Sequence, residues 1–344
     1  MDGTMSMPSR APSREPVLRI DGLTTRYYEP ERVTTAVDNV NLALHPGEIL
    51  GIVGESGCGK TTIALSILNL IPYPGSIDAG AVYFNGRNVL GMNDAALRDL
   101  RGREISMIFQ DAIAGLNPVL TIGQQVEEIM TAHGVNDHRE AHRRSIELLE
   151  TMGLSDAEAV AGRYAFQLSG GMAQRVMIAT AMALKPAVLI ADEPTSALDV
   201  TVQAQILEEL RRLRDQGVAI ILITHDFGVI AAMADSVAVM YAGRIAEQGD
   251  IDSIFYKPRH PYTAALLAAL PRLNQDLGFL VQVGGRPPDM SKLSAQCAFV
   301  PRCPKVRNEC RSLDSPPLEE ISPGHFAACY NPVFHREADD DEDE

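Results

Sequence analysis

The chain lacks long apolar runs. Its longest, at residues 218–223 and 264–270 of 344, are far short of the roughly 18–20 residues that a membrane-spanning helix needs. The first 16 residues contain Arg, Ser and Pro but no apolar segment of the kind found in a secretory signal. These absences argue against a helical membrane protein and a secreted protein. We therefore expect a protein kept in the cytoplasm, with residues 1–16 as a disordered leader.

Basic residues are also scarce, with 30 Lys and Arg against 45 Asp and Glu, and the formal net charge is −15. This balance argues against a protein whose main task is to coat nucleic acid, and we expect no nucleic-acid partner. Seven acidic residues lie in the last eight positions, so we expect residues 336–344 to form a solvated acidic tail. The overall composition, 46% hydrophobic and 22% charged, excludes a disordered or collagen-like chain.

Cysteines number only five, and a reducing cytoplasm disfavours disulfides as their use. Cys58 stands alone, whereas the other four cluster near the end: Cys297, Cys303, Cys310 and Cys329. Their C-x5-C-x6-C-x18-C spacing contains none of the short knuckles typical of structural zinc sites. Four thiolates can hold zinc or a 4Fe–4S cluster. The wide loops favour the cluster, in a structural or redox-sensing role; zinc and free thiols are the alternatives.

The order of apolar patterns predicts an α/β fold. Strands are expected at residues 17–20, 36–44, 48–53, 188–191 and 218–224, with a helix at 202–213 and a hairpin at 236–247. A strand, a helix and a second strand form a parallel crossover, which defines this fold class. Residues about 110–184 show helical patterns and are expected to form a helical insertion. Residues 251–335 are richer in Pro and Gly, and we expect them to form a second, smaller unit.

A phosphate-binding loop follows the predicted strand 48–53. Residues 54–61 read GESGCGKT, which matches the G-x-x-x-x-G-K-S/T pattern at the start of a predicted helix. Its glycines let backbone N–H groups surround an anion, Lys60 adds a positive charge at the β- and γ-phosphates, and the Thr61 hydroxyl can bind Mg²⁺. We also expect the loop to favour the Cys58 thiolate. The predicted ATP-binding residues are Gly54, Glu55, Ser56, Gly57, Cys58, Gly59, Lys60, Thr61 and Thr62.

A second motif, VLIADE at residues 188–193, ends a buried strand in two carboxylates. This position places Asp192 beside the metal of a phosphoryl-transfer site and leaves Glu193 able to orient or deprotonate water. Taken alone, two acidic residues can simply end a strand. Together with the phosphate loop they predict hydrolysis of a nucleotide.

Residues 168–175, LSGGMAQR, resemble the signature motif of ATP-binding-cassette (ABC) ATPases. The family's other motifs occur in the same order: Tyr27 at the adenine-stacking position, Gln110 after an apolar strand, SALD at residues 196–199, and His225. On these motifs, residues 17–250 are identified as an ABC ATPase domain. The resemblance implies a P-loop NTPase, ABC-type nucleotide-binding domain with a RecA-like core, an antiparallel β subdomain and a helical subdomain at about 110–184.

The resemblance also implies the roles of individual residues. Ser169, Gly170 and Gly171 would close over the ATP of a second, homologous ATPase subunit in a head-to-tail dimer. Met172 departs from the Gln that is frequent in the family, and we expect this to cost little. The implied catalytic residues are Glu193 at the water, His225 at the γ-phosphate, Gln110 at the metal or water and Lys60 at the phosphates. The implied Mg²⁺ ligands are Thr61, Gln110 and Asp192.

Residues 260–263, HPYT, resemble the C-terminal extension found in ATP-binding subunits of bacterial oligopeptide/dipeptide importers. Residues 109–111 (FQD), 116–118 (LNP) and 54–57 (GESG) resemble the same subfamily, although Ala112 stands where it often has Pro. Family members with similar C-terminal cysteines carry an iron–sulfur cluster, which adds weight to the 4Fe–4S interpretation.

This second resemblance implies an ATP-hydrolysing motor subunit for import of peptides or peptide-like solutes. Its partners would be two transmembrane permease subunits and an extracytoplasmic solute-binding protein, and it would lie peripherally on the cytoplasmic face of the inner membrane. Nickel and opines are alternative cargoes. A soluble ABC ATPase is the alternative class, but such proteins usually have two cassettes or a long coiled coil.

Overall fold

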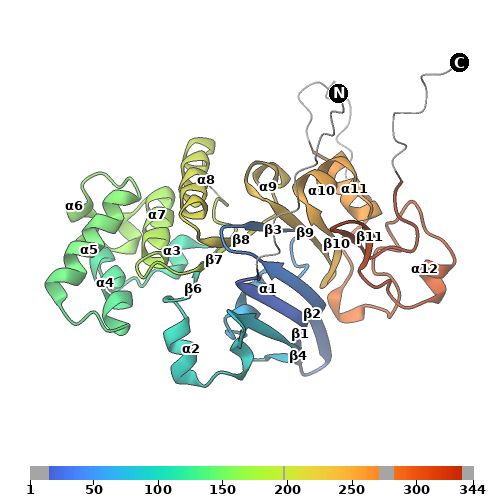
Figure 1. The fold of residues 1–344 in the computed structure, drawn as a ribbon, viewed down its shortest axis with the longest axis horizontal. Coiled ribbons are helices and arrows are strands. Elements are labelled where there is room, and N and C mark those ends of the chain that lie inside the picture. Colours follow the sequence, from blue (N-terminus) through green and yellow to red (C-terminus); the bar gives the residue numbers. More distant parts are fainter. Residues whose placement is uncertain (1–14, 197, 271–282, 335–344) are drawn as a thin grey trace, which may run out of the picture.

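The computed structural model describes residues 15–196, 198–270 and 283–334 (Figure 1). Nearly all of the predicted leader, Ala197 of the SALD motif and the predicted acidic tail lie outside the described residues. Within the described part, no helix is both long enough and apolar enough to cross a membrane.

The centre of the molecule is an eight-stranded mixed sheet. Its strands, in spatial order, are β11 (Glu319–Ser322), β12 (His325–Ala327), β10 (Arg244–Asp250), β9 (Ser236–Tyr241), β3 (Ile49–Val53), β8 (Ala219–Thr224), β7 (Val188–Asp192) and β6 (Ile105–Ile108). The strands from β9 to β6 pair in parallel. β3, β6, β7 and β8 are buried along their whole length, which explains their continuous apolar sequences. The predicted α/β class is confirmed.

A second sheet, antiparallel and four-stranded, packs beside the first. Its order is β2 (Arg32–Leu44), β1 (Leu18–Glu29), β4 (Gly75–Phe84) and β5 (Arg87–Asn88). β1 and β2 are much longer than the strands predicted at 17–20 and 36–44. Apart from the fully buried Leu23, their added residues are polar or at least partly exposed, so apolar patterning did not reveal them. The pairing of the two strands continues through several irregularities in register.

Helices α3 to α7 form a helical region at one end of the molecule (Figure 1). The C-terminal segment, by which we mean the described residues from 251 onward, lies towards the opposite end. The helices of the helical region are α3 (Ala112–Gly115), α4 (Ile122–Ala132), α5 (His138–Thr151), α6 (Ala157–Ala161) and α7 (Gly170–Ala181). Side chains at their N-termini explain where several begin. Thr121 and Gln124 form a capping box at α4, Asp137 caps α5, and Ser169 caps α7.

The remaining helices lie beside the two sheets or belong to the C-terminal segment. They are α1 (Lys60–Ile67), α2 (Asp94–Leu100), α8 (Val200–Asp215), α9 (Phe227–Met233), α10 (Ile251–Tyr256), α11 (Pro261–Ala268) and α12 (Glu309–Ser312), with 3₁₀ turns at Val89–Gly91, Ala165–Gln167 and Met290–Lys292. β12 pairs with β10, opposite Glu247 and Gln248. The C-terminal segment is therefore joined to the central sheet through backbone hydrogen bonds.

Candidate active site

The phosphate loop connects the end of β3 to the start of α1, as its sequence predicts. Gly59 has φ +108°, and a Cβ there would lie 2.1 Å from the carbonyl oxygen of Ala36. At Gly54 a Cβ would lie 2.2 Å from the carbonyl oxygen of Met240. Only glycine fits at these two positions, so the loop is shaped by close approach of backbone from β2 and β9.

The Lys60 side chain lies back across this loop and is almost fully buried. Its Nζ donates hydrogen bonds to the carbonyl oxygens of Gly54, at 2.8 Å, and Glu55, at 3.1 Å. These bonds hold a positive charge at a helix N-terminus, where backbone N–H groups and the helix dipole also favour an anion.

Asp192 and Thr61 meet at the carboxyl end of β7. The Thr61 hydroxyl donates to Asp192 Oδ2 over 2.7 Å, and Asp192 is 2% exposed. Asp192 Oδ1 is buried without a hydrogen-bond partner, and burial raises the pKa of the carboxyl group. A buried, unpartnered carboxylate oxygen is costly unless a cation satisfies it, and oxygen ligands of this kind suit Mg²⁺. These two residues therefore fit the predicted metal.

Three side chains meet just beyond Asp192. Gln110 Nε2 donates to Glu193 Oε2 over 3.0 Å, and His225 Nδ1 lies 3.1 Å from Glu193 Oε1. Glu193 itself has φ +48°, a left-handed conformation that is unusual for a non-glycine residue. Strained backbone conformations of this kind are concentrated at functional sites. Its carboxylate is thus held from both sides by residues that follow β6 and β8.

The other predicted residues lie apart from this cluster. Ser169 accepts a hydrogen bond from the Met172 N–H at the start of α7, and both Ser169 and Gly170 are exposed. Figure 1 shows α7 in the helical region, separated from α1. Tyr27 is half-buried on β1 in the antiparallel sheet. The described structure thus does not bring the signature motif onto the phosphate loop of the same chain.

Cys58 corrects one expectation. It is 5% exposed, and burial raises the pKa of its thiol more than Lys60 lowers it. The predicted thiolate is therefore wrong, because desolvation disfavours the charged form.

We expect alkylation of Cys58 to be slow at pH 7 and to accelerate as the pH rises through a pKa above the ordinary value of about 8.5, because only the thiolate attacks. Iodoacetamide labelling of Cys58, followed by mass spectrometry across pH and compared with glutathione, measures this. Bound MgATP should slow the reaction further. Labelling as fast as that of glutathione at pH 7 contradicts the burial argument.

The four C-terminal cysteines line one small apolar cavity of about 10 Å³. As the side chains are packed, that cavity admits at most about one water molecule. Burial raises the pKa of Cys297, Cys303 and Cys329, which keeps them as neutral thiols. Across the described ranges no group of three or more His, Cys, Asp or Glu side chains could hold a metal ion, and all five cysteines are free. The predicted 4Fe–4S cluster is therefore wrong, and its zinc alternative has no support.

Two family models match the chain. The ABC transporter model matches residues 37–196, and the model for the oligopeptide/dipeptide transporter C-terminal region matches residues 246–310. The oligopeptide transport ATP-binding protein OppD of Salmonella typhimurium is 44% identical over 318 residues, which is 92% of this chain and 94% of that protein. OppD of Escherichia coli K12 is 43% identical over 331 residues, 96% of this chain and 97% of that protein. The chain belongs to the ABC transporter ATP-binding proteins of the oligopeptide type.

Solved structures agree with this family. One is the dimeric structure of a post-hydrolysis state of the ATP-binding cassette MJ0796 bound to ADP and Pi. It aligns with a TM-score of 0.62 and 30% sequence identity, over 68% of this chain and 98% of the MJ0796 chain. cbiO1 from Clostridium perfringens, part of the complex cbiONQ, is 26% identical, with a TM-score of 0.59, and covers 71% of this chain and 92% of that one. An ABC ATPase implies ATP and Mg²⁺ as its ligands.

One contact of the phosphate loop was not anticipated by any motif. The Glu55 carboxylate is bound by Arg302, 247 residues further along the chain. Its only signal in the sequence is a lone arginine between Pro301 and Cys303, which carries no recognisable pattern.

Proposed function

We propose that this chain is the ATP-hydrolysing motor subunit of an ABC importer for di- and oligopeptides or peptide-like solutes. The observation that supports this proposal is that one chain contains both the Gln110–Glu193–His225 group beside the phosphate loop and a C-terminal region of the oligopeptide/dipeptide transporter type. The OppD relatives, similar over nearly their whole length, support the same conclusion.

In the proposed mechanism the backbone N–H groups of residues 54–61 and the Lys60 amine bind the β- and γ-phosphates of ATP. Asp192 and Thr61, with Gln110, are proposed to hold Mg²⁺. When bound, this ion neutralises negative charge on the phosphates.

Glu193 is proposed to orient the attacking water and to accept its proton, because its carboxylate ends a buried strand beside the phosphate loop. The hydrogen bond from Gln110 and the contact with His225 hold this carboxylate in position. His225 is 63% exposed at its side chain, which leaves it free to reach the γ-phosphate. Most of the catalysis is then positioning and stabilisation of charge.

The signature residues Ser169, Gly170 and Gly171 start α7, a 12-residue helix, with an exposed N-terminus that suits a phosphate. Because they lie away from the phosphate loop of their own chain, we propose that they complete the site of a second ATPase subunit. The assembly then contains two ATPase subunits, two transmembrane permease subunits and an extracytoplasmic solute-binding protein. This chain lies peripherally on the cytoplasmic side of the inner membrane.

The test is reconstitution of this chain with its permease subunits and solute-binding protein in lipid vesicles. We expect ATP-dependent uptake of labelled tri- to pentapeptides, and no uptake with a non-hydrolysable ATP analogue. Vesicles supplied with nickel instead of peptide are the control for cargo. ATP hydrolysis by a chain that never co-purifies with hydrophobic subunits would instead identify a soluble ABC ATPase.

A further inference from the structure

Arg302 forms a bidentate ion pair with Glu55 of the phosphate loop. Its Nη1 lies 2.6 Å from Glu55 Oε2, and its Nη2 lies 2.8 Å from Glu55 Oε1. The Arg302 side chain is 3% exposed and that of Glu55 is 23% exposed. Paired guanidinium–carboxylate bonds of this kind fix direction as well as charge, and their burial protects them from screening.

The guanidinium group is itself held in place by the C-terminal segment. Its Nε donates to the carbonyl oxygen of Gly284 over 2.8 Å, and Nη2 also reaches the carbonyl oxygen of Val283 at 3.3 Å. The rings of Tyr241 and Phe299 lie 5.8 and 5.9 Å from its Cζ atom. Arg302 therefore presents its charge to Glu55 in one arrangement.

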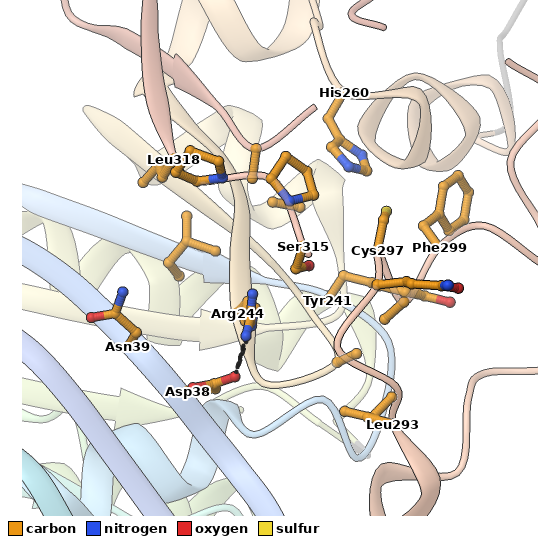
Figure 2. Close-up of a pocket in the computed structure, with 18 of the residues that line it drawn as sticks. Asp38, Asn39, Tyr241, Arg244, His260, Leu293, Cys297, Phe299, Ser315 and Leu318 are labelled. Atoms are coloured by element: carbon orange, nitrogen blue, oxygen red, sulfur yellow. Dashed lines mark hydrogen bonds and ion pairs between the residues drawn. The ribbon is translucent and has the colours of Figure 1, made fainter. Parts of the chain in front are cut away.

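Tyr262, from the HPYT motif, holds the same loop residue by its backbone. Its hydroxyl oxygen accepts a hydrogen bond from the Glu55 N–H over 3.1 Å. The side chain is fully buried, and its ring packs against Tyr241 and Phe299 at centroid distances of 4.5 and 5.4 Å. Figure 2 shows Tyr241 and Phe299 beside a cavity of about 360 Å³ at the junction of β2, β10 and the C-terminal segment.

Glu55 thus stands between the C-terminal segment and the phosphate-binding amine. Its carbonyl oxygen accepts a hydrogen bond from Lys60, while its N–H and carboxylate are bound by Tyr262 and Arg302. The carboxylate is also a negative charge within a loop that must receive a polyanion. Without Arg302 that charge would be unpaired and would repel the phosphates.

We propose that Arg302 and Tyr262 are positioning residues for ATP, through which the C-terminal segment orients Glu55 and neutralises its charge. ATP affinity then depends on a segment that lies outside the loop, strand and helix of the phosphate site. The alternative is a purely structural contact between the C-terminal segment and the phosphate loop. Loss of such a contact would lower the stability of the fold but leave ATP affinity unchanged.

The experiment is a double-mutant cycle on the full chain. MgATP affinity and thermal unfolding are measured for the wild type, Arg302→Ala, Glu55→Gln and the double variant. We expect Arg302→Ala to weaken ATP binding about tenfold, because it leaves the Glu55 charge unpaired. In a Glu55→Gln background the same substitution should change affinity by less than about threefold, because no charge is left to compensate. Tyr262→Phe, which removes only the hydroxyl group, should weaken binding about twofold to threefold.

Arg259→Ala is the matched control. Arg259 belongs to the same segment, but its side chain contacts the Val333 carbonyl oxygen and the Phe334 ring rather than the phosphate loop. We expect ATP affinity within about twofold of wild type for this variant, with any loss confined to the unfolding temperature.

A folded Arg302→Ala protein that binds ATP as wild type does would overturn the inference. Equal losses from Arg302→Ala in the wild-type and the Glu55→Gln backgrounds would overturn it too. Should Arg302→Ala not fold, Arg302→Lys keeps the charge but cannot make the paired bonds, and we expect about threefold weaker binding; unchanged affinity is the contrary result. The inference rests on the proposed function. Wild-type protein that does not bind ATP refutes that function, whereas normal wild-type binding with unaffected variants refutes only the positioning role.

Discussion

Glu193→Gln should bind ATP with near wild-type affinity and hydrolyse it at least about 100-fold more slowly. The substitution keeps the shape of the side chain but removes the carboxylate that accepts a proton from water, a contribution typically worth about 10²- to 10⁴-fold. The phosphate loop and the Thr61–Asp192 pair are untouched, so binding is retained. Steady-state phosphate release and equilibrium ATP binding on the purified complex measure the two quantities separately.

Glu150→Gln is the control for this variant, because Glu150 is exposed near the end of α5, away from the cluster. It should hydrolyse ATP at the wild-type rate. If the signature motif of one subunit completes the ATP site of the other, as proposed, ATP that is not hydrolysed should hold the two subunits together. Glu193→Gln is then also expected to elute as a dimer in the presence of ATP. Near-normal turnover by Glu193→Gln would remove Glu193 from its proposed role.

Lys60→Ala should fail at an earlier step and lose ATP affinity by at least about tenfold. The buried amine supplies the positive charge at the phosphates, and charge-assisted bonds are among the stronger polar interactions in proteins. The substitution also removes the hydrogen-bond donor that the carbonyl oxygens of Gly54 and Glu55 share. Equilibrium binding of a fluorescent ATP analogue measures the loss.

An exposed lysine provides the comparison for this second variant. Lys257→Ala, just beyond the end of α10, removes the same charge from an exposed position outside the phosphate loop and should bind ATP normally. An unchanged affinity in Lys60→Ala would contradict the assignment of the loop as the phosphate site. Glu193→Gln and Lys60→Ala together separate ATP binding from ATP hydrolysis, because only Glu193→Gln should retain bound nucleotide.

Much of the site could be predicted from local sequence. Lys60 and Thr61 follow one parallel strand, Asp192 ends another and Glu193 follows it, and His225 follows a third. Because the carboxyl ends of neighbouring parallel strands meet at one edge of a sheet, residues placed there come together. The long antiparallel strands β1 and β2 were underestimated, because most residues of their outer parts are polar or partly exposed and pair with neighbouring strands without an alternating apolar pattern.

The cysteines show where spacing alone misleads. Four thiols at wide intervals predicted a metal cluster, yet the volume they enclose is set by how Phe299, Val300 and Pro316 pack around them. Packing density is a property of the folded chain, and no pattern of intervals contains it.

By itself, the sequence determined the chemistry of the phosphate loop. Gly59 permits the local backbone conformation with φ +108°, and Lys60 places a positive charge at the start of the next helix, so both features depend on neighbouring residues in the chain. Only the tertiary structure decided what restrains that loop. Arg302 and Tyr262 reach Glu55 because β12 pairs with β10 and draws the C-terminal segment against the central sheet. Contacts across more than 200 residues depend on how the chain closes on itself, and no local propensity encodes that closure.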